Sequence, residues 1–174
     1  RKMLQILGAI LVIFSSTALG IAGKQKLVKR TKILGEWICA IDFITAEIEQ
    51  NHTPIPDILN MLSKQDNSSL KPVFIEMLNR INIQHELSFS YHWHTTIRDL
   101  AFSLGMEYEE IETLRNTASY LGRYQAEMQI SGLLHTRSKL VSIQTLAVQA
   151  LQNKGNVYRM CGIAAGIITV LMIV

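Results

Sequence analysis

The amino-acid sequence predicts an all-α protein: a cytosolic bundle of about six helices, flanked by an N-terminal and a C-terminal transmembrane helix. Three observations predict this class. Both ends of the 174-residue chain are apolar and uncharged. Between them, apolar residues recur at steps of three and four, the spacing of a helix with one buried face. Alternation with period two, which would predict strands, never lasts beyond a few residues.

The first apolar end, residues 4–23, holds about twenty residues without a charge, the length that a helix needs to cross a hydrocarbon core of roughly 30 Å. A basic flank follows at once, made of Lys24, Lys26, Lys29, Arg30 and Lys32. The last apolar end, residues 157–174, carries Arg159 near its start and no charge from Met160 onward. We therefore predict two transmembrane helices with one domain, residues 24–155, between them.

The basic residues also predict the orientation, because positive residues favour the cytoplasmic side of a span. The basic flank follows the first span, and Lys154 and Arg159 border the inner side of the second. Both ends are thus expected outside and the domain in the cytosol, at the cell membrane. A cleaved secretory signal is the alternative, since Ala18 and Gly20 have plausible cleavage spacing. A basic run directly after a cleavage site opposes translocation, so we favour the retained anchor.

Each predicted span holds a pair of small residues four positions apart, Ser16 with Gly20 and Gly162 with Gly166. This spacing lets two membrane helices approach closely, within one chain or between copies in a homo-oligomer. Glycine and alanine are also common in membrane helices in general. The sequence leaves both readings open.

The first span is expected to continue without a break to about residue 50, because an apolar stripe repeats at helical spacing and no proline interrupts it. The stripe consists of Ile33, Leu34, Trp37, Ile38, Ile41, Ile44 and Ile48. Thr53 is expected to cap a second helix that Pro54 opens. Asp66 lies in the polar loop that should follow this helix, and Pro72 is expected to open a third.

Three further helices complete the predicted domain. Trp93 is expected in the core of a fourth helix over about residues 88–104, which Gly105 should end. A fifth helix is expected to end at Gly122, because glycine is favoured just past a helix C-terminus. The sixth should cover about residues 124–153, with a hinge at residues 154–156 leading into the second span. Short connections predict antiparallel neighbours, and the first and last helices should lie side by side because both enter the membrane.

Composition and motifs speak against several functions. The net charge of +3 is modest, and the basic residues gather at the membrane edges, which does not favour nucleic-acid binding. Cys39 and Cys161 lie in different predicted segments, so no disulfide is expected. His92 and His94 are two positions apart and point to different faces of a helix, so we expect exposed or capping histidines and no metal site. No cofactor motif or catalytic pattern is recognisable, and an enzyme is not expected.

Four glutamates cluster at the start of the fifth predicted helix: Glu107, Glu109, Glu110 and Glu112. Acidic residues there complement the positive end of the helix dipole and form a solvated face. The functional reading is a docking patch for a basic partner. The spacing alone does not decide between these readings.

Five short stretches give the chain a family resemblance. They begin with LGAILVIFSSTALGIAGKQK and TAEI, continue with NHTPIPDIL and LGRYQAEMQ, and end with NKGNVYRMCGIAAGIITVLMIV. In this order they resemble the stage III sporulation protein AB family of endospore-forming Firmicutes, over essentially the whole chain. The positions that match the family pattern are Glu47, Ile48, Thr53, Pro54, Leu121, Gly122 and Gln129. Ala46 and Gln125 depart from it, where the family often has Thr and Asp, and Gln125 weakens the cap of the sixth helix.

The resemblance implies a structural membrane component of the channel apparatus between mother cell and forespore, on the mother-cell side. It implies other stage III sporulation proteins as partners. The family is distantly similar to the inner-membrane platform proteins of type II secretion and type IV pilus machines, which work beside a hexameric ATPase. By that analogy the domain would act as a scaffold that docks the stage III protein AA ATPase. The alternative is a membrane-anchored regulatory adaptor that signals through helix packing.

Overall fold

In the computed structural model, the backbone is described for residues 2–122 and 125–173, and side chains for 21–122, 125–153, 157, 160 and 164. Over this part of the chain the regular elements are helices, and the predicted all-α class with about six helices is confirmed. The chain divides into two units. One contains residues 30–145, and the other combines residues 1–29 with 146–174.

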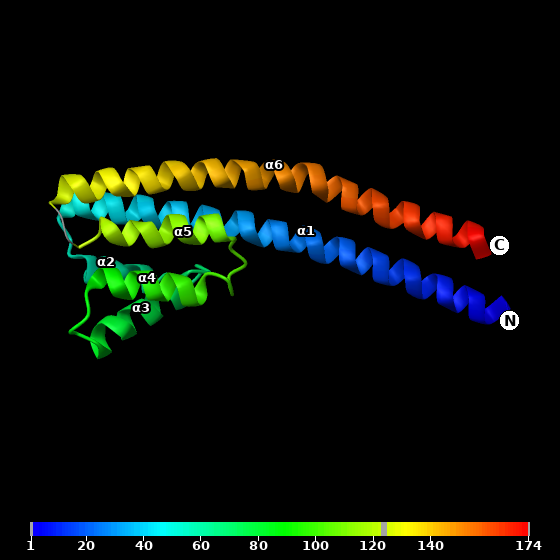
Figure 1. Cartoon of the computed structure of the whole chain (residues 1–174), viewed down its shortest axis with the longest axis horizontal. Helices are drawn as coiled ribbons and strands as arrows, with labels where there is room; N and C mark the ends of the chain where they lie inside the picture. Colours follow the sequence, from blue (N-terminus) through cyan, green and yellow to red (C-terminus); the bar gives the residue numbers. More distant parts are fainter. Residues whose placement is uncertain (1, 123–124, 174) are drawn as a thin grey trace. The chain divides into compact units, whose positions relative to one another are not determined.

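Two long helices begin and end the fold. Helix α1 covers Lys2–Ala46 and α6 covers Ala126–Ile173 (Figure 1). As predicted, α1 continues without a break into the domain, and a π-helical turn, η1 (Glu47–Asn51), follows it. The predicted hinge at residues 154–156 is wrong, because α6 runs through it. A single Gly155 costs a helix only about 1 kcal/mol relative to alanine, and no proline is present to break the hydrogen bonds.

Among the residues whose side chains are described, no helix combines the length and the apolar character required to cross a bilayer. The predicted spans, residues 4–23 and 157–174, fall almost wholly outside the part of the chain whose side chains are described. The side chains of Ser16, Gly20, Gly162 and Gly166 also lie outside it.

Four shorter helices complete the unit of residues 30–145: α2 (Ile55–Ser63), α3 (Lys71–Ile83), α4 (Phe89–Leu100) and α5 (Tyr108–Asn116). A short 3-10 helix, η2 (Thr117–Ser119), extends α5. Figure 1 shows these elements alongside the parts of α1 and α6 that belong to this unit. Within it, α1 and α6 lie side by side as predicted: Gln144 Nε2 donates to the Thr31 carbonyl oxygen at 3.2 Å, and Arg137 pairs with Asp42.

Turn residues mark several helix boundaries, but two helices end earlier than predicted: α4 ends at Leu100 and α5 at Asn116, and Gly105 and Gly122 lie at the ends of the turns that follow. Ser88 caps α4 by accepting from the Tyr91 N–H, and Pro72 lies in the first turn of α3. Gly105 and Gly122 have φ of 84° and 77°, values that glycine adopts without strain. The expectation for Thr53 is wrong: the N-cap of α2 is Pro54, and the Thr53 side chain binds Glu47 instead.

Three aromatic rings occupy the centre of the core. The Trp37 ring on α1 packs edge-on against Phe74 on α3 and Trp93 on α4, with centroid distances of 5.7 and 6.2 Å. Trp93 is buried as predicted, and its Nε1 donates to the Leu114 carbonyl oxygen at 2.7 Å. This cluster joins α1, α3, α4 and α5 into one packed body.

The contact between Tyr120 and α6 yields a testable prediction, because it requires a glycine. A Cβ at position 132 would lie 2.4 Å from Cγ of Tyr120 and 2.8 Å from its Cβ, so rotating the ring cannot relieve the clash. Gly132→Ala is therefore expected to destabilise the domain by about 1–2 kcal/mol, in spite of alanine's better helix propensity. Urea unfolding of the full chain measures this. Ser131→Ala, at the exposed neighbouring position, should be neutral or slightly stabilising, and equal behaviour of the two variants would contradict the close contact.

Candidate functional site

The acidic cluster at the start of α5 forms part of the helix cap. Glu107 is the N-cap residue, and Glu107 and Glu110 form a capping box in which each side chain accepts from the other's backbone N–H. The Glu107 N–H donates to Glu110 Oε2 at 2.8 Å. Such an arrangement satisfies two N–H groups that have no partner within the helix.

Arg30 completes this cluster from α1. Its Nε lies 2.6 Å from Glu110 Oε1 and its Nη1 lies 2.8 Å from Glu107 Oε1. The Glu110 side chain is 0% exposed and that of Arg30 is 17% exposed, so the pair is largely removed from solvent. Arg30, predicted as part of the basic flank, therefore connects α1 to the N-terminus of α5.

The other two glutamates of the cluster differ in their surroundings. Glu112 pairs with Arg115, which also donates from Nε to His94 Nε2 at 3.0 Å. Burial and the neighbouring Arg115 guanidinium lower the pKa of His94 below its ordinary value. Glu109 is exposed. We call Glu107, Tyr108 and Glu109 the α5 edge; the Tyr108 side chain is exposed and that of Glu107 is 58% exposed.

The lysines of the basic flank are exposed. Lys24, Lys26 and Lys29 belong to the unit formed by the chain ends, and Lys32 belongs to the domain. Lys32 Nζ lies 3.6 Å from Glu36 Oε1, a loose surface pair that contributes little to stability.

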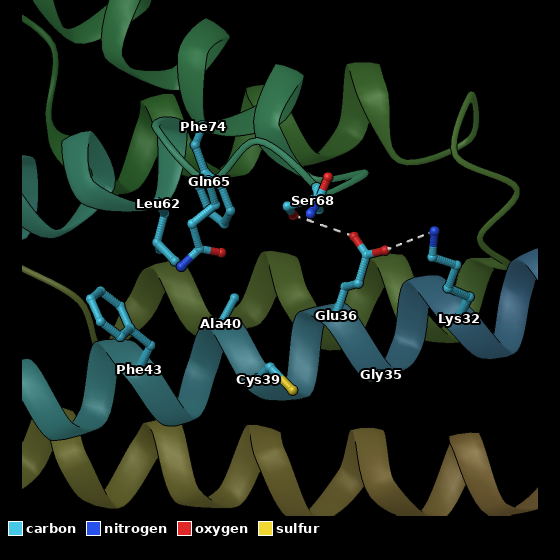
Figure 2. Close-up of a pocket in the computed structure, with 11 residues that line it drawn as sticks. Lys32, Gly35, Glu36, Cys39, Ala40, Phe43, Leu62, Gln65, Ser68 and Phe74 are labelled. Atoms are coloured by element: carbon cyan, nitrogen blue, oxygen red, sulfur yellow. Dashed lines mark hydrogen bonds and ion pairs between the residues drawn. The ribbon is translucent and has the colours of Figure 1, made fainter.

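A groove of about 580 Å³ lies between α1 and the connection from α2 to α3 (Figure 2). Phe43, Leu62 and Phe74 give it apolar walls, and Cys39, Gln65 and Asn67 are exposed along it. Figure 2 shows Glu36 reaching from α1 toward Ser68, with Lys32 on its other side. Apolar walls with a polar rim are typical of protein contact surfaces.

Glu36 fixes one side of this groove. Its carboxylate accepts from the Ser69 N–H at 2.6 Å, from Ser69 Oγ at 2.9 Å and from Ser68 Oγ at 3.3 Å. Because the Glu36 carboxylate binds Ser69, two residues before α3 begins, its negative charge also complements the positive end of that helix. This role of Glu36 was not predicted from the sequence, where the available signal was an acidic residue within an apolar stripe and a Ser-Ser pair ahead of a proline.

Residues of the family pattern meet at the turn after α1. Glu47 Oε2 accepts from Thr53 Oγ1 at 2.7 Å and from Asn51 Nδ2 at 3.1 Å, and the Thr53 N–H donates to the Glu47 carbonyl oxygen. His52 between them has φ of 50°, in the left-handed region. The motif therefore closes the turn that directs the chain from α1 into α2.

This turn predicts a pH dependence. The hydrogen bonds from Thr53 and Asn51 lower the pKa of Glu47 below its ordinary value of 4.5. Since the folded-state pKa is depressed, the stabilisation is present above the ordinary pKa and is lost as the pH falls through the lowered one. Thr53→Val should lessen the loss of stability below about pH 4.5, which melting curves at a series of pH values measure. An unchanged pH profile would contradict this role of Thr53.

The histidines are not part of a recognisable metal site in the described part of the chain. Among the described residues, no group of three or more His, Cys, Asp or Glu side chains could hold a metal ion. Of the two expectations for His92, an exposed or a capping side chain, the first is wrong because the side chain is 1% exposed, and the second holds because Nε2 lies 3.1 Å from the carbonyl oxygen of Gln84, the C-cap residue of α3. Cys39 is an exposed free thiol.

Fold and surface together define an all-α domain, a packed helical bundle with an acidic edge at α5 and a groove that has apolar walls and a polar rim. Comparisons with known proteins identify the family to which the chain belongs. The family model for stage III sporulation protein AB matches residues 5–174, and the chain belongs to this family. The chain is also 20% identical over 171 residues to stage III sporulation protein AB of Bacillus subtilis (strain 168), covering 98% of this chain and 99% of that protein.

A solved structure supports the fold. The structure titled stage III sporulation protein AB (SpoIIIAB) superposes with a TM-score of 0.65 at 19% identity, covering 71% of this chain and 97% of the solved chain. At this identity the likeness establishes a shared helical fold. The family resemblance predicted from the motifs is confirmed by the family model.

Proposed function

We propose that this chain is a structural membrane component of the channel apparatus between mother cell and forespore, built together with other stage III sporulation proteins. The observation that carries the proposal is the family match across residues 5–174, which includes both uncharged ends as well as the helical domain. A secretion-like assembly needs parts that hold other proteins at a membrane, and a helical bundle between two apolar ends suits that task.

The proposed arrangement is a hairpin with spans at residues 4–23 and 157–174 and the domain on the mother-cell side. The lysines at positions 24, 26 and 29, which are exposed, support this orientation under the positive-inside rule. The small-residue pairs, Ser16 with Gly20 and Gly162 with Gly166, are proposed to pack helices within the hairpin or between copies.

The proposed partner of the domain is the stage III protein AA ATPase, and the proposed contact is the α5 edge. Of the four clustered glutamates, Glu109 is the one to test, because Glu107 and Glu110 hold the helix cap and Glu112 pairs with Arg115. Reversing the charge at Glu107 or Glu110 would disturb folding together with any contact.

The test is ATPase capture by the full chain in detergent. Glu109→Lys is expected to weaken capture about tenfold, because a charge facing a basic surface would become repulsive. Glu86→Lys, an exposed reversal on the connection from α3 to α4, is the matched control and should bind as the unmodified chain does. Equal capture by both variants would remove the α5 edge from the proposal.

A regulatory adaptor would differ in when its gene is expressed and in which gene lies next to it. Expression restricted to sporulation, from a gene next to that of the ATPase, favours the channel component. Expression during growth without that neighbour would favour the adaptor.

A further inference from the structure

A second cavity, of about 240 Å³, lies where the start of α2, the end of α3 and the start of α4 meet. Figure 1 shows this junction at one end of the unit of residues 30–145 and the start of α5 at the other end. The lining of the cavity is mostly apolar and includes Ile55, Pro56, Ile81, Leu87 and Phe89. It shares no residue with the groove of Figure 2 or with the α5 edge.

Apolar side chains in and around this cavity are open to solvent. Leu87 in its wall is 43% exposed, and Ile83 at the end of α3 is 79% exposed. The Tyr91 ring is 51% exposed and lies 6.0 Å from the ring of His92, which lines the cavity. We call the cavity with Ile83, Leu87 and Tyr91 the α3–α4 patch. Single exposed apolar residues are common, whereas a cluster of them around a cavity is typical of an interaction site.

Hydrogen bonds hold the segment that carries Leu87 in place. The Leu87 N–H donates to the Gln84 carbonyl oxygen at 3.1 Å. His92 Nε2 lies 3.1 Å from the same oxygen, and a carbonyl oxygen can only accept, so the imidazole donates. This bond connects the segment to α4. The wall is therefore formed before a partner binds, which lowers the entropic cost of binding.

The charges beside the α3–α4 patch are mainly acidic. Asp57 and Glu86 each adjoin a lining residue in the chain, and both are exposed. Among the described residues that adjoin the lining in this way, the basic one is Arg80, which pairs with Glu76 at 2.7 Å and with Asp99 at 2.9 Å. The rim therefore favours a partner that carries Lys or Arg beside its apolar group, because opposite charges attract across an interface.

The volume of the cavity limits what it can hold. An apolar cavity of about 150 Å³ is large enough to bind benzene, so this one has room for one large apolar side chain such as Phe or Leu. Phe89 in the wall would pack against an aromatic ring.

We propose that the α3–α4 patch binds a segment of a second partner protein. This segment places one large apolar side chain in the cavity and its basic residues against Asp57 and Glu86. The α5 edge lies at the other end of the domain and stays free for a different contact (Figure 1). ATPase capture at the α5 edge and binding at the α3–α4 patch can therefore fail independently.

The test uses the acetylated peptide amide Lys-Lys-Phe-Lys-Lys as a probe. The full chain is held in nanodiscs of phosphatidylcholine, whose headgroup has no net charge, and binding is followed by the backbone amide signals of Leu87 and Phe89. Two comparison peptides replace the phenylalanine by serine or the four lysines by glutamates. The probe is expected to bind about fivefold more tightly than either, because each lacks one half of the proposed contact. Equal binding of a comparison peptide, or unchanged signals of both residues, would overturn the proposal.

Variants of the chain test the same contact. Leu87→Ser removes an exposed part of the wall and is expected to weaken probe binding about threefold, monitored at Phe89. Ile75→Ser is the matched control, because Ile75 is 41% exposed on α3 and does not line the cavity, and it should bind as the unmodified chain does. Equal binding by these two variants would overturn the proposal.

Glu86→Gln tests the charge separately from the apolar contact. It is expected to weaken binding of the probe about twofold and to leave binding of the uncharged peptide Ser-Ser-Phe-Ser-Ser unchanged, because only the probe carries charges that face Glu86. An equal effect on both peptides, or no effect on either, would contradict the proposed role of the acidic rim.

Discussion

Replacing Arg30 with glutamine is expected to destabilise the helical domain by about 3 kcal/mol. The substitution leaves the carboxylate of Glu110, which is fully buried, without the guanidinium 2.6 Å away. A buried charge without its partner is far more costly than the loss of a surface pair. Urea unfolding of the full chain in detergent, followed by tryptophan fluorescence, measures the change.

Two comparisons make this prediction specific. Lys32→Gln, a loss of the same charge two residues away, should cost well under 1 kcal/mol, because Lys32 is 65% exposed, its pair with Glu36 is long, and the Glu36 carboxylate keeps its hydrogen bonds from Ser69. Adding Glu110→Gln to Arg30→Gln should recover part of the stability, since the buried charge is removed while the amide oxygen can still cap α5. If the double variant were less stable than Arg30→Gln alone, the buried charge would not be the cause.

The second large effect is expected at the core tryptophans. Trp93→Ala should destabilise the domain by about 4 kcal/mol, because it removes a fully buried ring together with the hydrogen bond from its Nε1 to the Leu114 carbonyl oxygen.

The phenylalanine variants distinguish the hydrogen bond from the packing. Trp93→Phe loses part of the packing and the hydrogen bond to Leu114. Trp37→Phe loses a similar amount of packing but no hydrogen bond, because its Nε1 has no partner in the described part of the chain. Trp93→Phe is therefore expected to cost about 1–2 kcal/mol more than Trp37→Phe. Equal losses, measured by thermal unfolding at one pH, would show that the bond to Leu114 contributes nothing.

Local patterns in the sequence predict much of this fold because their causes are local. The apolar stripe from Ile33 to Ile48 is buried along α1 and η1. Gly105 and Gly122 have the positive φ that glycine favours, although α4 and α5 end before them. Trp93 could be assigned to the core because apolar neighbours recur at helical spacing on both sides of it.

Interactions between distant residues could not be predicted in the same way. The Glu110 carboxylate is buried because Arg30, 80 positions earlier, reaches it, and neither residue signals the other in the sequence. The position of Glu36 beside Ser69 likewise depends on how the connection to α3 returns to α1. For His92 the sequence left an exposed and a capping side chain open, and the choice depends on Gln84, eight residues earlier, whose carbonyl oxygen the ring contacts.

The orientation of the domain is the central claim, and cysteine labelling tests it most directly. In a chain with Cys39→Ser and Cys161→Ser, single cysteines introduced at the exposed positions Gln65 and Glu86 report which side of the membrane the domain occupies. A membrane-impermeant maleimide should leave both unlabelled in intact cells and label both after permeabilisation. Labelling of either position in intact cells would contradict a cytosolic domain, and the proposed ATPase contact with it.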